Sequence, residues 1–184
     1  MNTGTQRALA KPVEVALSQW FAIRVRSRHE KVATNQLSLH GIETYLPLMK
    51  QVHQWSDRKK GVDMPLFAGY VFARFHPSSD DRLRVLKSHG VVGFVGPHWE
   101  QTPIPEVQIR SIQGILASGE AVEDHAYLKA GQRVRIRGGA LDGVEGILSS
   151  LNRDRSLIIT VEPIGRSISM RIEGYEVDVI DARD

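Results

Sequence analysis

The sequence of 184 residues contains no cysteine, which excludes disulfides, thiolate metal sites and a cysteine nucleophile. It also lacks an apolar run of about 18 residues, the length that a membrane-spanning helix requires. Its first segment, Met1 to Val15, mixes charged residues with Gly and Pro and has no apolar core of the kind found in signal peptides. We therefore expect a cytoplasmic protein whose residues 1–18 form a disordered tail.

The motifs of common enzymes are also missing. No Gly-Lys-Ser/Thr occurs that could close a phosphate-binding loop, and no nucleophile elbow is present. The glycines of the second half lie between expected strands rather than before a helix, so they do not fit the dinucleotide fingerprint. His29 and His40 fall on one expected helix about 16 Å apart along its axis, too far apart to share a metal ion. We predict that the protein is not an enzyme and holds no cofactor or metal.

Charge is distributed unevenly along the chain. Residues 1–117 carry 15 Lys and Arg against 9 Asp and Glu, whereas residues 118–184 carry 9 against 12. A basic first half and a mildly acidic second half indicate different partners for the two halves. The alternative is that the excess of basic residues is only a solvated surface.

The first half alternates strand and helix patterns, which predicts an α/β sandwich. Ser27 and Glu30 fit a capping box at the start of a helix, and Gly41 suits its left-handed end. In the next helix Leu83 and Leu86 are expected on the inner face. The expected strands cover residues 20–26, 43–49, 51–55, 69–75 and 91–95, a polar turn covers 56–61, and two further helices cover 80–88 and 106–117.

The second half contains five short alternating segments separated by turns, a pattern typical of a small β-barrel. The expected strands cover residues 133–137, 144–151, 157–161, 167–172 and 176–180. Residues 118–126 carry three acids and no basic residue, and we interpret them as a linker. The fold class is therefore α+β, with a first domain over 19–117 and a five-stranded, SH3-like barrel domain over 127–184.

Two features of the first half indicate binding. Residues 66–70 place large apolar side chains around Gly69, either as part of the core or as a surface that takes a partner helix. Basic residues gather near Trp20 and Trp55, on whose rings unpaired bases could stack, which favours single-stranded nucleic acid over a merely solvated surface. These basic residues are Arg24, Arg26, Arg28, His29 and Lys31 in one group, and Arg58, Lys59 and Lys60 in the other.

These residues are where the chain resembles the NusG family, which joins an N-terminal NGN domain to a KOW barrel. The likeness covers residues 20–181, with both modules in order. The NGN likeness lies in Trp20-Phe21, residues 65–72 (PLFAGYVF), residues 93–96 (GFVG) and residues 103–105 (PIP), and the KOW likeness in residues 131–146 and 164–166. Ala68 departs from the family, which usually has proline there. Residues 26–31, 41–43, 45–47 and 55–60 are similar to the specialised UpxY-type branch, antiterminators that act on selected operons, often for surface polysaccharides.

The resemblance implies a monomeric transcription elongation factor that suppresses pausing or termination by RNA polymerase. Its pocket for the clamp helices of the polymerase β′ subunit would be formed by Trp20, Pro47, Leu66, Phe67 and Tyr70. We expect this pocket to be open in the free protein. The side facing the β gate loop would include Asp81, Arg82 and Arg84. The basic residues Arg26, Arg28, His29, Lys31, Arg58, Lys59 and Lys60 would face non-template DNA in the transcription bubble.

The barrel departs from housekeeping members of the family at its partner loop. Leu141, Val144 and Ile164, beside Arg166, stand where those members carry phenylalanines for ribosomal protein S-ten and Rho. Aliphatic residues weaken the expectation of both contacts, that of Rho more. Unlike RfaH, a specialised relative that refolds its last domain into helices, this half is expected to remain a barrel, because its glycines are poor helix formers.

Two other functions remain open. The first is a general NusG-type factor that couples polymerase to Rho or to the ribosome. The second is a ribosome-associated, RNA-binding KOW protein that never contacts polymerase. The pocket around Tyr70 discriminates against this second alternative, because RNA binding does not require it.

Overall fold

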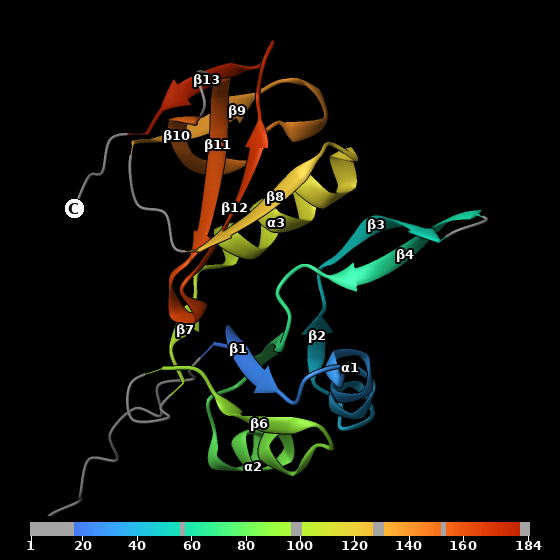
Figure 1. Ribbon diagram of the computed structural model, residues 1–184. Coiled ribbons are helices and arrows are strands. Elements are labelled where there is room, and N and C mark those ends of the chain that lie inside the picture. The colour runs from blue at the N-terminus through green and yellow to red at the C-terminus, as the bar shows by residue number, and fades with distance from the viewer. Residues whose placement is uncertain (1–16, 56–57, 97–100, 127–130, 152–153, 181–184) are drawn as a thin grey trace, which may run out of the picture.

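The computed structural model describes residues 17–55, 58–96, 101–126, 131–151 and 154–180 (Figure 1). Residues 1–16, which make up most of the predicted N-terminal tail, lie outside this description. The described chain is a mixed α+β protein, which confirms the predicted fold class. Its first half is built around one antiparallel sheet and its last third is almost entirely strand.

The first sheet has the strand order β2-β5-β1-β6, and the short β7 also pairs with β1. Its central strand β1 (Gln19–Val25) lies antiparallel to β5 (Tyr70–Phe75), with Phe21 opposite Ala73. The outer strands are β2 (Glu43–Tyr45), β6 (Val91–Phe94) and β7 (Pro103–Ile104). Strands were predicted at all of these positions except β7, which the two prolines concealed because proline cannot donate to a sheet.

One face of the first sheet is covered by two helices. These are α1 (Glu30–Leu39) and α2 (Ser79–Lys87), which lie on this side of the sheet in Figure 1. Side chains alternate across a strand, so Phe21 and Ile23 of β1 point to this face. They form one buried cluster with residues of β5, α1 and α2, among them Phe75, Leu37 and Val85.

Helix α1 begins differently from the prediction. Its N-cap is His29, not Ser27, and no side chain caps it. Arg28 takes a left-handed backbone conformation (φ 62°), so the chain enters the helix only after it. The Glu30 carboxylate is not available for a capping box, because it accepts a hydrogen bond from the backbone of Gly69. The predicted end is confirmed, with Gly41 at φ 75°.

Helix α2 also turns a different side to the sheet than expected. Leu83 and Leu86, predicted to face inward, are 51% and 45% exposed. Val85 is the fully buried residue of this helix. Ser78 caps the helix by accepting a hydrogen bond from the backbone N–H of Asp81. The inner face of α2 is therefore the one that carries Val85, which packs into the cluster of the first sheet, and the spacing of the two leucines did not reveal this.

Strands β3 (Leu48–Trp55) and β4 (Arg58–Pro65) form a separate two-stranded ribbon that projects from the first sheet (Figure 1). The turn predicted over 56–61 is shorter than expected, since β4 already begins at Arg58. In the register of the ribbon, Trp55 lies opposite Arg58. Trp55 and Arg58, the first residue of the second basic group, are therefore neighbours at the outer end of the ribbon. Their side chains lie outside the described part of the chain.

The C-terminal sheet has the strand order β13-β9-β10-β11-β12-β8. Its last five strands confirm the five predicted ones: β9 (Gln132–Arg137), β10 (Glu145–Leu151), β11 (Asp154–Val161), β12 (Arg166–Arg171) and β13 (Glu176–Val179). The last strand returns to pair with the first of these, as expected for a barrel of this type. Strand β8 (Val122–Ala126) pairs with β12, so part of the segment that we interpreted as a linker belongs to this sheet.

The second face of the first sheet is covered by helix α3 (Glu106–Ser118) and the C-terminal sheet. Ile109, Ile112 and Ile115, at helical spacing on α3, are essentially inaccessible to solvent. They belong to one buried cluster that reaches from Phe72 of β5 to Leu157 of β11. Burial of each such side chain contributes about 1.5–3 kcal/mol, so this face is as apolar as a domain core.

Candidate functional site

The five residues predicted to form the apolar pocket lie together on this second face. Trp20 comes from β1, and Leu66 and Phe67 follow the end of β4. The N–H of Leu66 donates to the carbonyl of Pro47 at 2.8 Å, and the N–H of Tyr70 donates to the carbonyl of Phe67 at 3.2 Å. Backbone hydrogen bonds thus hold Pro47 and residues 66–70, two separate segments of this group, against each other.

Glu30 fixes the turn within this group, a role that sequence analysis missed. Its Oε1 accepts a hydrogen bond from the N–H of Gly69 at 2.8 Å, and the residue is 6% exposed. The carbonyl of Gly69 in turn accepts from the N–H of Val25 at 2.9 Å. Gly69 has φ 84°, which side-chain-bearing residues rarely adopt. The only signal in the sequence was an acid at a helix start, and it indicated a capping box instead.

Tyr45 and Phe72 line the same face next to the pocket residues. Their rings are stacked with centroids 6.3 Å apart, and Phe67 meets Phe72 edge to face at 5.9 Å. Such arrangements are preferred by aromatic pairs. Burial raises the pKa of the Tyr45 hydroxyl to about 12, because the charged form loses hydration. The face therefore combines aromatic rings with an environment of low polarity.

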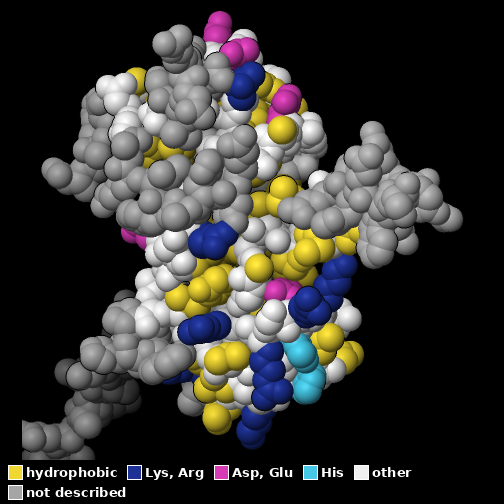
Figure 2. Space-filling model, in the orientation of Figure 1, with side chains coloured by type: hydrophobic (Ala, Val, Ile, Leu, Met, Phe, Trp, Pro, Cys, Tyr) yellow, Lys and Arg dark blue, Asp and Glu magenta, His cyan; other side chains and the backbone are white. Residues whose placement is uncertain are grey.

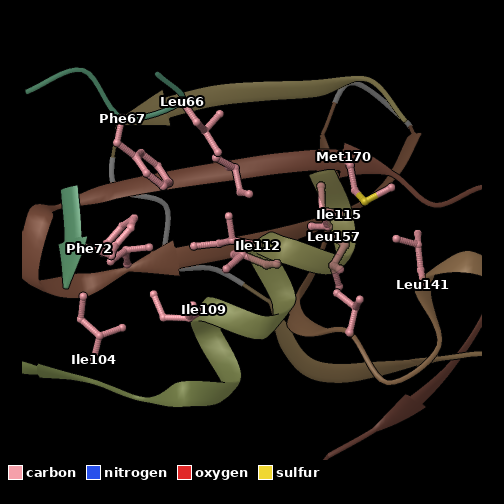
Figure 3. Packing of buried hydrophobic residues seen from close by; sticks show 14 of the residues in the cluster. Leu66, Phe67, Phe72, Ile104, Ile109, Ile112, Ile115, Leu141, Leu157 and Met170 are labelled. Atoms are coloured by element: carbon pink, nitrogen blue, oxygen red, sulfur yellow. The ribbon is translucent and has the colours of Figure 1, made fainter. Parts of the chain in front are cut away.

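The prediction that the pocket is open is wrong for this structure. Trp20, Leu66 and Phe67 are 5%, 2% and 1% exposed, and Tyr70 is half-buried. The residues that cover them come from the chain itself, because the buried cluster continues through α3 into the C-terminal sheet. In Figure 3 the isoleucines of α3 lie between Phe72 on one side and Leu141 and Leu157 on the other. The hydrophobic pattern of the sequence could not predict that the pocket is closed, because it indicates that a residue is buried but not which segment covers it.

The contact between α3 and the C-terminal sheet is close and specific, and we call it the seam. The Oγ of Ser111, itself buried, accepts a hydrogen bond from the N–H of Glu145 at 3.1 Å. A Cβ on Gly114 would lie 2.9 Å from Cγ2 of Val144, closer than real Cβ contacts. Glycine inside a helix costs about 1 kcal/mol relative to alanine. Its presence at this point is explained by the near approach of the helix to Val144.

The predicted partner loop of the barrel lies partly at the seam. Leu141 belongs to the 3-10 turn η2 (Gly139–Leu141), which contacts α3, and it is fully buried. Val144 and Ile164 are 5% and 9% exposed. Arg166, the fourth predicted residue, is half-buried at the start of β12. The part of the partner surface that Leu141 and Val144 form is therefore closed by α3.

The first basic group lies on the end of β1 and on the loop that leads into α1, and Figure 2 shows Lys and Arg side chains gathered next to histidine on one part of the surface. Arg24, Arg26, Arg28 and Lys31 are exposed and His29 is half-buried. Trp20 is buried, so the expectation that bases stack on its ring is wrong for this conformation. The second group, Arg58 to Lys60, lies on β4, and its side chains and that of Trp55 lie outside the described part.

The three residues predicted to face the gate loop lie on α2. The Arg84 guanidinium pairs with the Asp81 carboxylate at 3.4 Å, one turn apart. The Arg82 guanidinium lies over the ring of Phe94, 5.6 Å from its centroid. Both arginines thus contact neighbours in the free protein, and the exposed surface of α2 between them includes the apolar Leu83.

Two further features were sought within the described residues. No group of three or more His, Asp or Glu in that part of the chain is arranged to hold a metal ion. None of its helices is long and apolar enough to cross a membrane.

Comparison with known proteins identifies relatives along most of the chain. Residues 18–113 match the family model described as "Transcription termination factor nusG". The chain is 27% identical over 177 residues to the transcription termination/antitermination protein NusG of Lactococcus lactis, covering 89% of this chain and 94% of that one. It is 24% identical over 180 residues to the NusG protein of Borreliella burgdorferi, covering 88% of this chain and 98% of the relative.

A solved structure described as "Domain interaction in Thermotoga maritima NusG" covers 89% of this chain at 20% identity, and its TM-score is 0.48. At that score the overall arrangement of the two molecules supports no argument, so the family assignment rests on sequence. The family model matches more than half of the chain, and the relatives align over nearly their whole length. The protein therefore belongs to the NusG family.

Proposed function

We propose that the protein is a transcription elongation and antitermination factor that binds RNA polymerase through the pocket of its first sheet. The relatives in Lactococcus and Borreliella carry the name of termination/antitermination proteins. The observation that carries the proposal is the joint placement of Leu66, Phe67 and Tyr70 on one aromatic face, within one hydrogen bond of the basic loop through Glu30. An RNA-binding protein that never meets polymerase has no need of that face.

In the proposed complex the apolar face takes the two clamp helices of the β′ subunit, and α2 faces the gate loop of the β subunit. The exposed patch of Arg26, Arg28 and Lys31 lies toward the non-template strand, where it neutralises phosphates without reading their sequence. Bridging the two sides of the cleft disfavours the open polymerase conformations that accompany pausing. This effect is a population shift by differential binding and requires no catalysis.

Because the pocket is closed, polymerase binding in this proposal requires the seam to separate. Two features favour separation. The side-chain Oε1 of Gln108, on α3, is buried and has no hydrogen-bond partner among the described residues, a defect that costs about 1–3 kcal/mol. Beside it, a cavity of about 550 Å³ lies between α3 and the C-terminal sheet. Opening the seam gives the Oε1 of Gln108 access to solvent, which offsets part of the cost of the apolar surface that it exposes.

The partner loop of the barrel supports a specialised rather than a general factor. Leu141, Val144 and Ile164 offer aliphatic surface where aromatic anchors commonly dominate an interface. We therefore propose that the factor acts on selected operons, such as those for polysaccharides. Binding of ribosomal protein S-ten follows only after the seam opens, and binding of Rho is weak. The general NusG-type role remains the second candidate, because the relatives carry the name transcription termination/antitermination protein NusG.

The test is an affinity measurement with purified RNA polymerase on the full chain. Tyr70→Ala removes a half-buried ring of the pocket, and we expect about a thirtyfold loss of affinity, the size typical of an interface hot spot. Phe67→Ala is expected to lose at least as much. Leu39→Ala serves as the matched control, since Leu39 is 77% exposed at the end of α1, a helix that covers the opposite face of the sheet.

Thermal unfolding of each variant separates loss of binding from loss of structure. A folded Tyr70→Ala variant that binds polymerase as tightly as the original chain would remove the pocket from the proposal. Equal losses in Tyr70→Ala and Leu39→Ala would contradict it as well.

A further inference from the structure

The segment that connects α3 to the barrel is itself a strand of the C-terminal sheet. Strand β8 pairs antiparallel with β12, from Val122 opposite Met170 to Ala126 opposite Arg166. It stands at one end of the strand order, so within the described sheet it is paired along one edge. Figure 1 shows the chain turning back from the end of α3 into β8. The backbone of this segment is therefore bonded to the barrel, while its start is joined covalently to α3.

The connection between α3 and β8 is very short. Residues 119–121 separate the two elements. Gly119 ends the helix with φ 74°, and the N–H of Glu120 donates to the Oγ of Ser118 at 3.2 Å, which fixes the first part of the turn. An extended chain advances by at most about 3.6 Å per residue, so Val122 stays within about 15 Å of Ser118. While β8 is paired with β12, the barrel cannot move further than this from the end of α3.

The pairing of β8 is favourable but can be undone. Strand β8 contains Glu123 and Asp124, whereas β12 has Arg166 and Arg171 at its two ends, and opposite charges on neighbouring strands stabilise a sheet. Val122 is half-buried against the cluster that includes the isoleucines of α3. The inner strand β11 has eight residues and is paired along both edges, whereas β8 has five residues and one paired edge. Strand β8 is therefore the part of this sheet that detaches at the lowest cost.

We propose that β8 is a strap that keeps the seam closed, and that its detachment from β12 is the step that frees the barrel. The inference rests on the proposed opening of the seam and names the element that limits it. With β8 paired, the seam closes through a tether of three residues, 119–121; with β8 detached, the chain between α3 and β9 has thirteen, 119–131. The probability of closing a loop falls as about the 3/2 power of its length, so detachment raises the open fraction of the seam about tenfold.

The test detaches β8 by changing two adjacent residues, Glu123→Pro together with Asp124→Pro. Adjacent residues of an antiparallel strand direct their N–H groups to opposite edges, so one of the two prolines removes a hydrogen bond to β12 in either register. The matched control is Glu123→Ala together with Asp124→Ala. It removes the same two carboxylates and keeps both N–H groups, so it separates strand pairing from charge.

The readout is the rate at which a thiol reagent labels a cysteine introduced in the seam of the full chain, with polymerase absent. The chain has no cysteine of its own, and Val144→Cys places one where the original side chain is 5% exposed and faces Gly114 of α3. When reclosing is faster than labelling, this rate is proportional to the open fraction. Two fully buried positions report unfolding instead: Ala33→Cys on α1 for the first domain, and Val134→Cys on β9 for the barrel.

We expect the proline pair to raise the labelling rate of Val144→Cys about tenfold and to leave Ala33→Cys and Val134→Cys unchanged. An unchanged rate at Val144→Cys, or an equal increase with the alanine pair, would overturn the proposal. An increase shared by Val134→Cys would overturn it too, because β8 would then stabilise the barrel rather than the closed seam. Since polymerase takes no part in this assay, its failure leaves the pocket test unaffected, and failure of the pocket test leaves this result in place.

Discussion

The two faces of the first sheet are equally apolar but are covered in different ways. The face that carries Phe21 and Ile23 is closed by α1 and α2, which follow β1 and β5 directly along the chain. The face that carries Trp20 and Phe72 is closed by α3, which follows β7 of the same sheet just as directly, and by the C-terminal sheet, which begins at Val122, about fifty residues after Phe72. The helices that directly follow a strand of the first sheet belong to the core of this domain, whereas the C-terminal sheet is the distant part of the second cover and the part that we propose to separate.

The difference is also visible in the quality of packing. Among the described residues, the two buried side-chain atoms without a partner are Oε1 of Gln101 and of Gln108, and Gln108 borders the cavity at the seam. Neither residue contributes to the cluster beneath α1 and α2. Native cores rarely leave buried polar atoms unpaired. The face with the defects is the one that we propose to be exposed for polymerase.

The largest expected effect comes from the locally covered face. Phe21→Ala removes a ring that is 1% exposed and lies 4.7 Å from the ring of Phe75, measured between centroids. We expect the free energy of unfolding to fall by about 3–5 kcal/mol, as for other large-to-alanine changes in cores. Chemical denaturation followed by tryptophan fluorescence measures this change. A loss below about 1 kcal/mol would mean that this face is no more a core than the other.

The second expected effect is smaller, and it is a gain of affinity for polymerase rather than a loss of stability. It concerns the contact between α3 and the C-terminal sheet. Gly114→Leu places a side chain where even a Cβ meets Val144 at 2.9 Å, so it acts as a wedge in the seam. Raising the open fraction raises the apparent affinity for polymerase in proportion, and we expect about a tenfold increase. Gln113→Leu, on the exposed side of the same helix, is the matched control. Unchanged or weaker binding by Gly114→Leu would contradict the masking role of the seam.

The smallest expected effect concerns Tyr45, whose pKa is raised by burial to about 12. Below pH 10 the hydroxyl is neutral in both folded and unfolded chains, and its contribution to stability is present in full. Between pH 10 and 12 the unfolded chain ionises first, so stability falls as the pH rises. After allowance for solvent screening, we expect Tyr45→Phe to remove about 1 kcal/mol of this loss. Thermal unfolding of the original chain and of Tyr45→Phe at alkaline pH measures this difference. An equal loss of stability in the two proteins would show that ionisation of Tyr45 does not cause it.

Much of the fold could be predicted from the sequence because local patterns determine it. The alternation in residues 20–26 and 133–137 defines strands, and Gly41 defines a helix end by its left-handed backbone. Errors occurred where a distant group competes with a local one. Glu30 bonds to Gly69 rather than to its own helix start, and Val85 of α2 packs against the first sheet while Leu83 is left exposed.

The sequence predicted which residues belong to the candidate site, but not whether the site is open or closed. The motif around Phe67 and Tyr70 indicated the predicted pocket residues, and the structure brings Trp20, Leu66, Phe67 and Tyr70 together in one cluster. Their closure depends on a contact between α3 and the C-terminal sheet, to which no periodicity within either segment points. Gly114 carried the one local signal of the seam, a glycine inside an otherwise apolar helix.

The account depends most on the seam opening before polymerase binds, and a reversible lock tests this directly. The chain has no cysteine of its own, so Gly114→Cys with Val144→Cys introduces a single pair. Cγ2 of Val144 lies 2.9 Å from the position of a Cβ on residue 114, close to the distance of about 3 Å between Cβ and the far sulfur in a disulfide. The measurement is the affinity for RNA polymerase of this variant, oxidised and then reduced. We expect binding to be lost on oxidation and restored by reductant, and full binding by the oxidised form would contradict the account.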